Sequence, residues 1–386
     1  MMIRSLLTTT LILTVQPVMA SSFETFLEKT KPLALQSGVS ARTYAKATSG
    51  LKPDERIDRF TKRQPELVKP IGGYITRRVE GPLAKSGRRH ARKMSRLLRQ
   101  IEQKFGVDPY VVAAIWGMET AYGSGIGTSN AIRSLATLGW KKYRGDFFQK
   151  ELVDALLIMQ EENLRRSDMV SSWAGAMGQT QLIPSSFRKF AVDFDKNGKR
   201  DLWRQKGDAL ASTANYLKQK GWIAGQPWGF AVKLPSSLPK MAFTQTWQDW
   251  ASNGVRARSG KPFPKKGEAT LFFPAGHEGP AFLISPNYEV IRDYNSSDAY
   301  SLSVGLLSNR LRGQKNTPMQ WPKDKTLNKE QRMRVQSLLL KKGFDVPNRT
   351  GRIIKGVRSA IRDYQVTIGA VADGYPDLEL LRQLAR

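Results

Sequence analysis

The sequence predicts a mainly α-helical (α+β) protein with a small helical domain at its C-terminal end. Apolar residues recur with helical spacing through most of the chain, strand-like apolar runs are short, and a polar stretch with two prolines interrupts the pattern near residue 320. A chain of 386 residues also exceeds what one hydrophobic core usually supports. We therefore expect domains at 21–312 and 326–386, joined by a linker at 313–325.

Residues 1–20 are expected to be a signal peptide. A basic region ends at Arg4, an apolar run follows, and a small-residue cleavage site ends at Ala20. A membrane anchor is the alternative, but the run is shorter than the ~20 apolar residues that a span needs. Because the chain has no cysteine, disulfides and a lipidated N-terminal Cys are excluded. The mature protein is expected to be exported and soluble, without a membrane anchor.

Helical patterns dominate the first part of the chain. They cover 24–107, continue from the N-cap Asp108, and return at 147–163 after a glycine-rich connection. The last segment before Asp108 places seven cations on one face, namely Lys85, Arg88, Arg89, Arg92, Lys93, Arg96 and Arg99. The block SSWAGAMGQTQLIPSSF at 171–187 forms a poor helix, because two glycines flank Ala-Met, and we expect it to line a cleft.

Later segments carry mixed signals. We expect a loop-rich region from 215 to about 247, strands at 271–274 and 281–284, a turn and then a helix at 287–307, and helical patterns at 327–347 and 351–364. The chain therefore changes from helices to short strands and back to helices.

The charge of the chain favours a polyanionic partner. Lys and Arg total 62 against 33 acids, which gives a net charge of +29. Nucleic acid, anionic lipid and an acidic cell-wall polymer all fit, but export disfavours nucleic acid, so none is expected as a partner. With two histidines and no cysteine, the usual His/Cys zinc site and a Cys-His nucleophile pair cannot be assembled.

Glu119 is the candidate general acid. Val112, Ile115, Trp116 and Glu119 recur at helical spacing, which points the carboxyl group where the apolar side chains point. Poor solvation raises a carboxyl pKa, as a general acid needs at neutral pH. The alternative is a glutamate satisfied by a buried arginine or by backbone donors.

A candidate calcium loop starts at Asp193 between two predicted helices. Its spacing follows the helix–loop–helix calcium motif, with loop positions taken by Asp193, Asp195, Asn197, Lys199 and Asp201. Position 12 should be an acid but is Arg204, which removes ligand oxygens and adds positive charge. The alternative is a loop whose Asp and Asn side chains close Asx turns.

Taken together, the motifs resemble the membrane-bound lytic murein transglycosylase B family, glycoside hydrolase family 103. AIWGMETAYG, FFQKEL, SSWAGAMGQTQLIPSSF, AVDFDKNGKRDLW and ALASTANYLKQKGW carry the resemblance, which extends from about 39 to 307. It implies a lysozyme-like catalytic domain that cleaves the N-acetylmuramic acid to N-acetylglucosamine bond of periplasmic peptidoglycan. Glu119 would then act alone as acid and base, with no required cofactor, to give a 1,6-anhydro product.

The resemblance also implies substrate-binding residues. They are Ser172, Gln181, Tyr216, Tyr294, Asn295, Tyr300 and Arg144. Tyr and Asn side chains can hydrogen-bond the acid or an N-acetyl group, and an aromatic face can pack on a sugar ring. Core packing is the alternative for the tyrosines. Arg144 stands where the family usually has the second of two adjacent arginines, so it carries the proposed contact to substrate carboxylates alone.

The last domain resembles the small three-helix peptidoglycan-binding domain type 1. The shared features include Gly343-Phe344, Tyr364-Gln365 and Ala372-Asp373-Gly374, although the usual turn between helices is degraded at 348–351. A generic helical interaction domain is the alternative.

Two other functions fit the same motifs. The alternatives are a non-catalytic scaffold that binds the wall and a hydrolytic muramidase, which needs an activated water and a second carboxylate.

Overall fold

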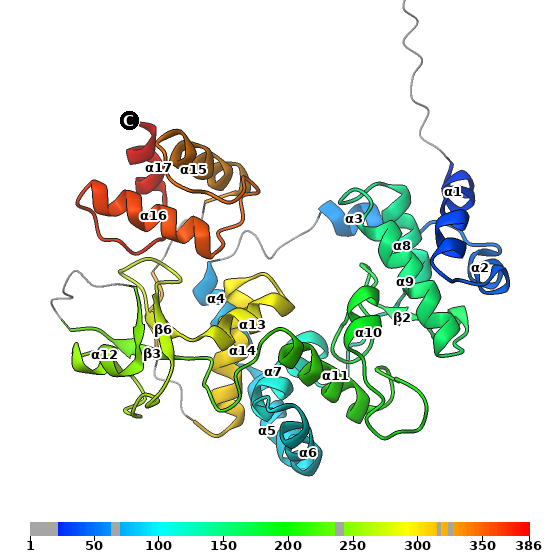
Figure 1. The fold of residues 1–386 in the computed structure, drawn as a ribbon, viewed down its shortest axis with the longest axis horizontal. Coiled ribbons are helices and arrows are strands. Elements are labelled where there is room, and N and C mark those ends of the chain that lie inside the picture. Colours follow the sequence, from blue (N-terminus) through cyan, green and yellow to red (C-terminus); the bar gives the residue numbers. More distant parts are fainter. Residues whose placement is uncertain (1–21, 63–69, 236–242, 315–317, 323–326) are drawn as a thin grey trace, which may run out of the picture.

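The computed structural model describes residues 22–62, 70–235, 243–314, 318–322 and 327–386, and it is mainly helical, as predicted (Figure 1). The expected signal peptide at 1–20 lies outside these residues, as does much of the expected linker. Within the described ranges, no helix is long and apolar enough to cross a membrane.

Within residues 22–311, all helices except the one that packs on the sheet described below form two groups around one large hydrophobic core. In the first group, α8 (Ala131–Trp140) and α9 (Phe147–Glu161) pack together and are surrounded by α1 (Phe23–Gln36), α2 (Ala41–Thr48), α3 (Ile57–Lys62) and α10 (Pro184–Phe190). The second group contains α4 (Ile71–Val79), α5 (Pro82–Lys93), α6 (Ser95–Phe105), α7 (Pro109–Thr120), α11 (Lys206–Gln219), α13 (Pro286–Tyr294) and α14 (Asp298–Leu311). Figure 1 shows the two groups side by side.

The predicted start of the Glu119 helix is confirmed. The side chain of Asp108 accepts a hydrogen bond from the backbone N–H of Tyr110 at 2.9 Å, and Pro109 occupies the first helical position. The expectation of one helix for the basic stripe is wrong, because the chain breaks at Met94 between α5 and α6. All seven cations of the stripe are exposed.

A five-stranded antiparallel sheet is inserted between α11 and α13. Its order is β4 (Thr244–Thr246), β6 (Glu268–Phe272), β7 (Ala281–Ile284), β3 (Gly229–Lys233) and β5 (Arg256–Ala257). With α12 (Trp247–Ser252) it forms a separate small core around Trp247, Trp250 and Leu283. The insertion gives the predicted catalytic region a second core that the sequence did not predict.

The secondary structure predicted for residues 215–307 is only partly confirmed. The strand predicted at 281–284 is confirmed as β7, whereas the strand predicted at 271–274 is shifted, because β6 covers Glu268–Phe272 and shares only residues 271–272 with the prediction. The loop-rich prediction for 215–247 is wrong where α11 continues to Gln219 and where β3 and β4 form, since pairing with distant strands stabilises these short segments. The turn predicted at the start of 287–307 is also wrong, because Pro286 and the N-cap Ser285 start α13.

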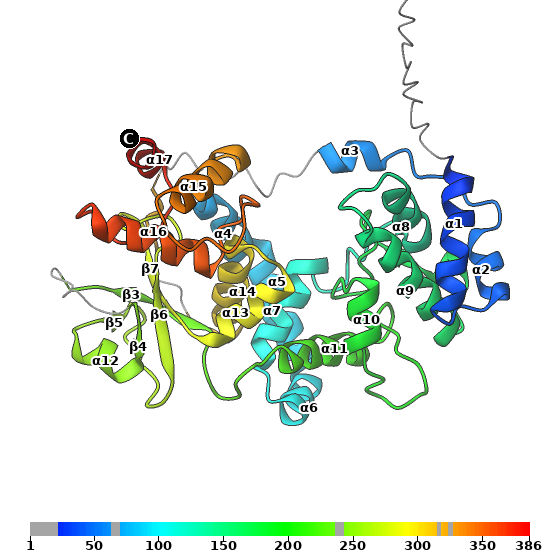
Figure 2. The same ribbon diagram turned by 45° about the horizontal axis from the view of Figure 1, so that its top comes forward.

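The C-terminal region has its own hydrophobic core, built by α15 (Lys329–Lys341), α16 (Lys355–Thr367) and α17 (Leu378–Ala385). A buried glutamine holds each of its two turns. Gln336 Oε1 accepts from the backbone N–H of Gly351 at 2.7 Å, and Gln365 Oε1 accepts from that of Gly374 at 2.8 Å. Both views place this region beside the sheet and near α13 and α14 (Figure 2).

Candidate functional site

Glu119 lies in the last turn of α7, partly buried, where the first turn of α14 packs against it. The hydroxyl of Tyr300 donates a hydrogen bond to Glu119 Oε1 at 2.6 Å. Tyr300 is 4% exposed, and burial raises its pKa well above the usual value, with the charge of Glu119 adding to the effect. The phenol therefore stays protonated and acts as a donor that orients the carboxyl group.

Two further tyrosines from the predicted set lie beside this pair. Tyr294 donates to the carbonyl oxygen of Thr180 at 2.6 Å, and Tyr216 donates to that of Asp293 at 2.8 Å. Their rings meet edge to face with centroids 4.9 Å apart. Burial raises the pKa of Tyr216 to about 12 and raises that of Tyr294, where the charge of Glu119 contributes. Both hydroxyls therefore bind backbone carbonyl oxygens of the protein itself, which fixes the two rings in place.

Residues 171–183 of the predicted block form a tight, non-helical loop, as predicted, whereas its last four residues belong to α10, which begins at Pro184. β1 (Ser129–Asn130) pairs with β2 (Val170–Ser171), and Met177 bridges to both Ser171 and Leu182. Ser172 Oγ accepts from the backbone N–H of Ala176 at 3.2 Å. The structure therefore gives Ser172 a role in holding the loop.

Gln181 also holds this loop. Its backbone is left-handed, at φ 56°, and its Nε2 donates to the carbonyl oxygens of Gly178 at 2.9 Å and Ile126 at 3.2 Å. The opposing strand approaches so closely that a Cβ at Gly127 would lie 2.1 Å from the carbonyl oxygen of Ser171. Only glycine fits at that position.

The sequence did not single out Gln179, which joins the loop to α7. Its Oε1 accepts from the indole N–H of Trp116 at 3.1 Å, and its backbone carbonyl accepts from Thr120 Oγ1 at 2.6 Å. Gln179 and Gln181 flank Thr180 in the same motif, but only Gln179 is fully buried. No local pattern separates the two glutamines, because Thr180 between them is also buried and the backbone turns at Gly178 and Gln181.

Asn295 and Arg144, the last two predicted substrate-binding residues, lie on different parts of the molecule. Asn295 caps the C-terminal end of α13, and its carbonyl oxygen accepts from the backbone N–H of Ser297 at 2.6 Å, between Tyr294 and Tyr300. Arg144 is exposed in the turn between α8 and α9, with its guanidinium 5.5 Å from the ring of Tyr143. The structure therefore groups Asn295 with the Glu119 site, and places Arg144 on other elements.

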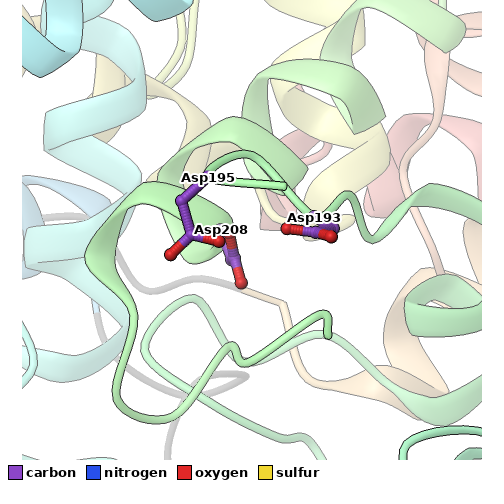
Figure 3. Close-up of side chains that lie close together, drawn as sticks. All are labelled: Asp193, Asp195 and Asp208. Atoms are coloured by element: carbon purple, nitrogen blue, oxygen red, sulfur yellow. The ribbon is translucent and has the colours of Figure 1, made fainter. Parts of the chain in front are cut away.

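The candidate calcium loop brings three carboxylates together. Oxygens of Asp193, Asp195 and Asp208 lie within 4.8 Å of one another (Figure 3). Asp208 is fully buried on α11 and was not in the predicted set, because the motif places its last acid at position 12 and Asp208 is four residues later. Burial raises the pKa of Asp208, and the charges of Asp195 and Asp193 raise it further. A divalent cation would relieve this repulsion, and carboxylate oxygens suit calcium.

Other predicted residues of this loop have local partners. Asp201 is not part of the carboxylate group, since its Oδ1 accepts from the backbone N–H groups of Trp203 and Arg204. Asn197 Oδ1 accepts from the backbone N–H of Lys199 at 3.0 Å, which is an Asx turn. Hydrogen bonds from Arg165 are the main cause that lowers the pKa of Asp168, and the charge of Arg204 lowers it further. Arg204 therefore lies close enough to act on a carboxyl group outside the three-aspartate cluster.

Comparisons with known proteins identify relatives of the chain. Residues 22–309 match the family model described as the transglycosylase SLT domain. Membrane-bound lytic murein transglycosylase B of Escherichia coli (strain K12) is 32% identical over 218 residues, or 54% of this chain. The chain spans 58% of the length of that relative.

Solved structures resemble more of the chain. SltB3 from Pseudomonas aeruginosa in complex with NAG-anhNAM-pentapeptide matches with a TM-score of 0.84 and 41% identity, over 95% of this chain and 100% of that chain. The same protein in complex with NAG-NAM-pentapeptide gives 0.83 and 41%, over 94% and 99%. Escherichia coli Slt35 in complex with calcium matches with a TM-score of 0.62 and 26% identity, over 75% and 92%.

Proposed function

The chain belongs to the transglycosylase SLT domain family, and we propose that it is a lytic transglycosylase of peptidoglycan that leaves 1,6-anhydro ends. The observation that carries the proposal is the hydrogen bond from Tyr300 to Glu119, which orients a single carboxyl group at the end of α7. The SltB3 complexes with NAG-NAM-pentapeptide and NAG-anhNAM-pentapeptide support the same substrate and product class for this chain.

In the proposed reaction, Glu119 donates its proton to the glycosidic oxygen as the bond to the anomeric carbon breaks. The N-acetyl group of the muramic acid closes onto that carbon through its carbonyl oxygen. Glu119, now a carboxylate, accepts the proton of the C6 hydroxyl of the same sugar, whose oxygen displaces the N-acetyl group. The acid is regenerated and no water is consumed.

The acids on neighbouring elements favour this scheme over hydrolysis. The 171–187 block contains no Asp or Glu. Asp293 lies 3.9 Å from Lys220 Nζ, and Asp298 is paired with Arg292 and Arg358. Hydrolysis needs a carboxylate that activates water, whereas Asp298 is held by two arginines and the exposed Asp293 side chain lies by Lys220.

We assign wall binding to the C-terminal three-helix region and to the positive charge of the chain. The region has its own core and two glutamine-pinned turns, which suit an independent binding domain. The net charge of +29 suits a wall that carries peptide carboxylates. Export through a signal peptide at 1–20 and action in the periplasm complete the proposal.

We also propose that Asp193, Asp195 and Asp208 hold a calcium ion, with Asn197 and the backbone of Lys199 as further oxygen donors. The geometry of the three carboxylates and the repulsion at Asp208 support a cation here. Asp208 supplies the acid that Arg204 does not. Calcium would stabilise the junction between the loop and α11, and it takes no part in the reaction.

The test is mass spectrometry of the soluble products released when the mature protein digests purified sacculi. Anhydro-muropeptides are the expected products. Reducing-end products would establish a hydrolytic muramidase, and an absence of soluble products with retained sacculus binding would establish a scaffold. Glu119→Gln, which keeps the shape of the side chain but cannot donate the acid proton, is the matched control.

A further inference from the structure

Asp298, at the start of α14, forms ion pairs with two arginines that lie on opposite sides of the junction with the C-terminal region. Asp298 Oδ1 lies 3.1 Å from Arg292 Nε of α13, and Asp298 Oδ2 accepts a hydrogen bond from Arg358 of α16 in the C-terminal region. The side chain of Asp298 is 16% exposed, and that of Arg358 is 10% exposed. Such a charge-assisted hydrogen bond, largely withdrawn from solvent, has a fixed geometry.

The two arginines are themselves held in place. Arg292 also donates to the carbonyl oxygen of Ile353, just before α16, at 3.0 Å. The guanidinium of Arg358 lies 4.7 Å from the ring centroid of Phe272 in β6. The C-terminal region is therefore attached at this point to α13, to α14 and to the sheet.

The same helical turn contacts the acid of the site. Tyr300 is two residues after Asp298, and side chains two apart on a helix face different sides. Asp298 faces the C-terminal region, whereas the hydroxyl of Tyr300 reaches Glu119. Ser297 caps the turn by accepting from the backbone N–H of Tyr300 at 3.3 Å. A displacement of this turn at Asp298 must therefore move Tyr300 relative to Glu119.

We propose that Arg358 is a positioning residue for the catalytic acid. Through Asp298 it fixes the first turn of α14, and through Tyr300 it fixes the orientation of the Glu119 carboxyl group. The C-terminal region then has a role in turnover that is separate from wall binding. The inference rests on the proposed function, because it assigns Glu119 the role of the acid.

The chain offers a matched control on the same helix. Arg362 lies one turn after Arg358, is similarly buried and also joins the C-terminal region to the sheet, since it donates to the carbonyl oxygen of Leu271 at 2.9 Å. Its guanidinium lies 4.2 Å from the ring centroid of Phe243. None of these contacts involves α14. Arg362→Ala therefore weakens the same junction without touching Asp298.

The experiment measures kcat and KM on soluble peptidoglycan strands for full-length Arg358→Ala, Arg358→Lys and Arg362→Ala, each with and without Tyr300→Phe. Arg358→Ala is expected to lower kcat roughly 10-fold with little change in KM, within the ~100-fold that a misplacement of 1 Å costs. In the Tyr300→Phe background, Arg358→Ala is expected to have no further effect, because the two residues act in series. Arg358→Lys restores part of kcat, and Arg362→Ala leaves it near the wild-type value.

Three results would overturn the inference. They are an equal loss in Arg362→Ala, an unchanged kcat in Arg358→Ala, and a full, independent loss from Arg358→Ala in the Tyr300→Phe background. Should Arg358→Ala fail to fold, Arg358→Lys provides the same comparison, with a smaller expected loss. Wild-type protein that releases no anhydro-muropeptides would contradict the proposed function, whereas normal wild-type products with an unaffected Arg358→Ala would contradict this inference alone.

Discussion

Glu119 and the Asp193, Asp195 and Asp208 cluster are both carboxylate sites, yet the protein holds them with different donors. At Glu119 the described hydrogen bond comes from the side chain of Tyr300. At the aspartates, backbone N–H groups donate. Those of Phe194 and Asp201 bind Asp208 at 2.8 and 2.9 Å, and that of Gly198 binds Asp193 at 2.7 Å.

The difference separates two kinds of chemistry. Three carboxylates within 4.8 Å of one another concentrate negative charge, which a cation can neutralise. One carboxyl group beside a buried phenol is aimed by a donor that itself stays protonated, and it can exchange a proton with a substrate. We therefore expect substitutions at Glu119 to change turnover and substitutions in the aspartate cluster to change stability.

The largest expected effect is that of Glu119→Gln. The amide keeps the size of the side chain and can still accept from Tyr300, but it cannot supply the acid proton. Turnover should fall by roughly 10²- to 10⁴-fold, the range for loss of a general acid. Release of soluble muropeptides measures it, with thermal unfolding and sacculus binding as controls that should not change. Substantial activity in this variant would remove Glu119 from the mechanism.

Tyr300→Phe tests the orienting bond. The ring and its packing remain while the donor to Glu119 Oε1 is lost, so kcat should fall roughly 10-fold, as expected when a catalytic group is less well aligned. The matched control is Tyr216→Phe, which also removes one buried hydroxyl but leaves the bond to Glu119 intact. Equal losses in kcat for the two variants would show that Tyr300 only supports packing.

Asp208→Asn tests the aspartate cluster. Calcium is expected to raise the Tm of the wild-type protein above its value in chelator, with a stabilisation of about 2.7 kcal/mol at a calcium concentration 100 times Kd. The variant should lose this increment while kcat at the Glu119 site changes little. Asp201→Asn is the control, because Asp201 lies outside the cluster and the increment should remain. A Tm that does not respond to calcium in the wild type would contradict the assignment.

The smallest effect concerns Glu151, a buried acid on α9 that has no cation partner among its described hydrogen bonds. Its carboxylate accepts from the N–H and hydroxyl of Ser185, yet burial is the largest influence and raises its pKa. The folded state therefore keeps this proton at pH values where the unfolded chain has lost it. Its contribution to stability is present at low pH and is lost as the pH rises through the raised pKa. Glu151→Gln should flatten this part of a Tm against pH curve, and an unchanged curve would contradict the prediction.

Local signals explain what the sequence could predict. Asp108 and Pro109 define the start of α7 within a few residues, and Gly175 and Gly178 exclude a helix from the part of the 171–187 block that precedes α10. Strand β7 is a short apolar run that could be found directly, whereas β6 begins at Glu268, three residues before the apolar run that identified its end. The position of Glu119 on an apolar stripe follows from helical spacing alone.

Contacts between distant residues explain what could not be predicted. Strand β3 depends on pairing with β7, about 50 residues later, and Gln179 is identified only by its contact with Trp116. Asp208 joins the aspartate cluster from a helix after the loop, beyond the position where the motif places its last acid. The pair formed by Asp298 and Arg358 spans 60 residues and has no local pattern.

The hydrogen bond between Tyr300 and Glu119 joins residues that are 181 positions apart in the sequence, and the whole inserted sheet is formed by residues that lie between them in the chain. Closing so long a loop is slow compared with forming a helix, and the contact cannot exist before residue 300 has been synthesised. A growing or partly folded chain thus carries the acid of α7 without the phenol that aims it. The aimed form of the acid is therefore acquired only when α14 has packed against α7, so full activity under the proposed function is a property of the completed fold.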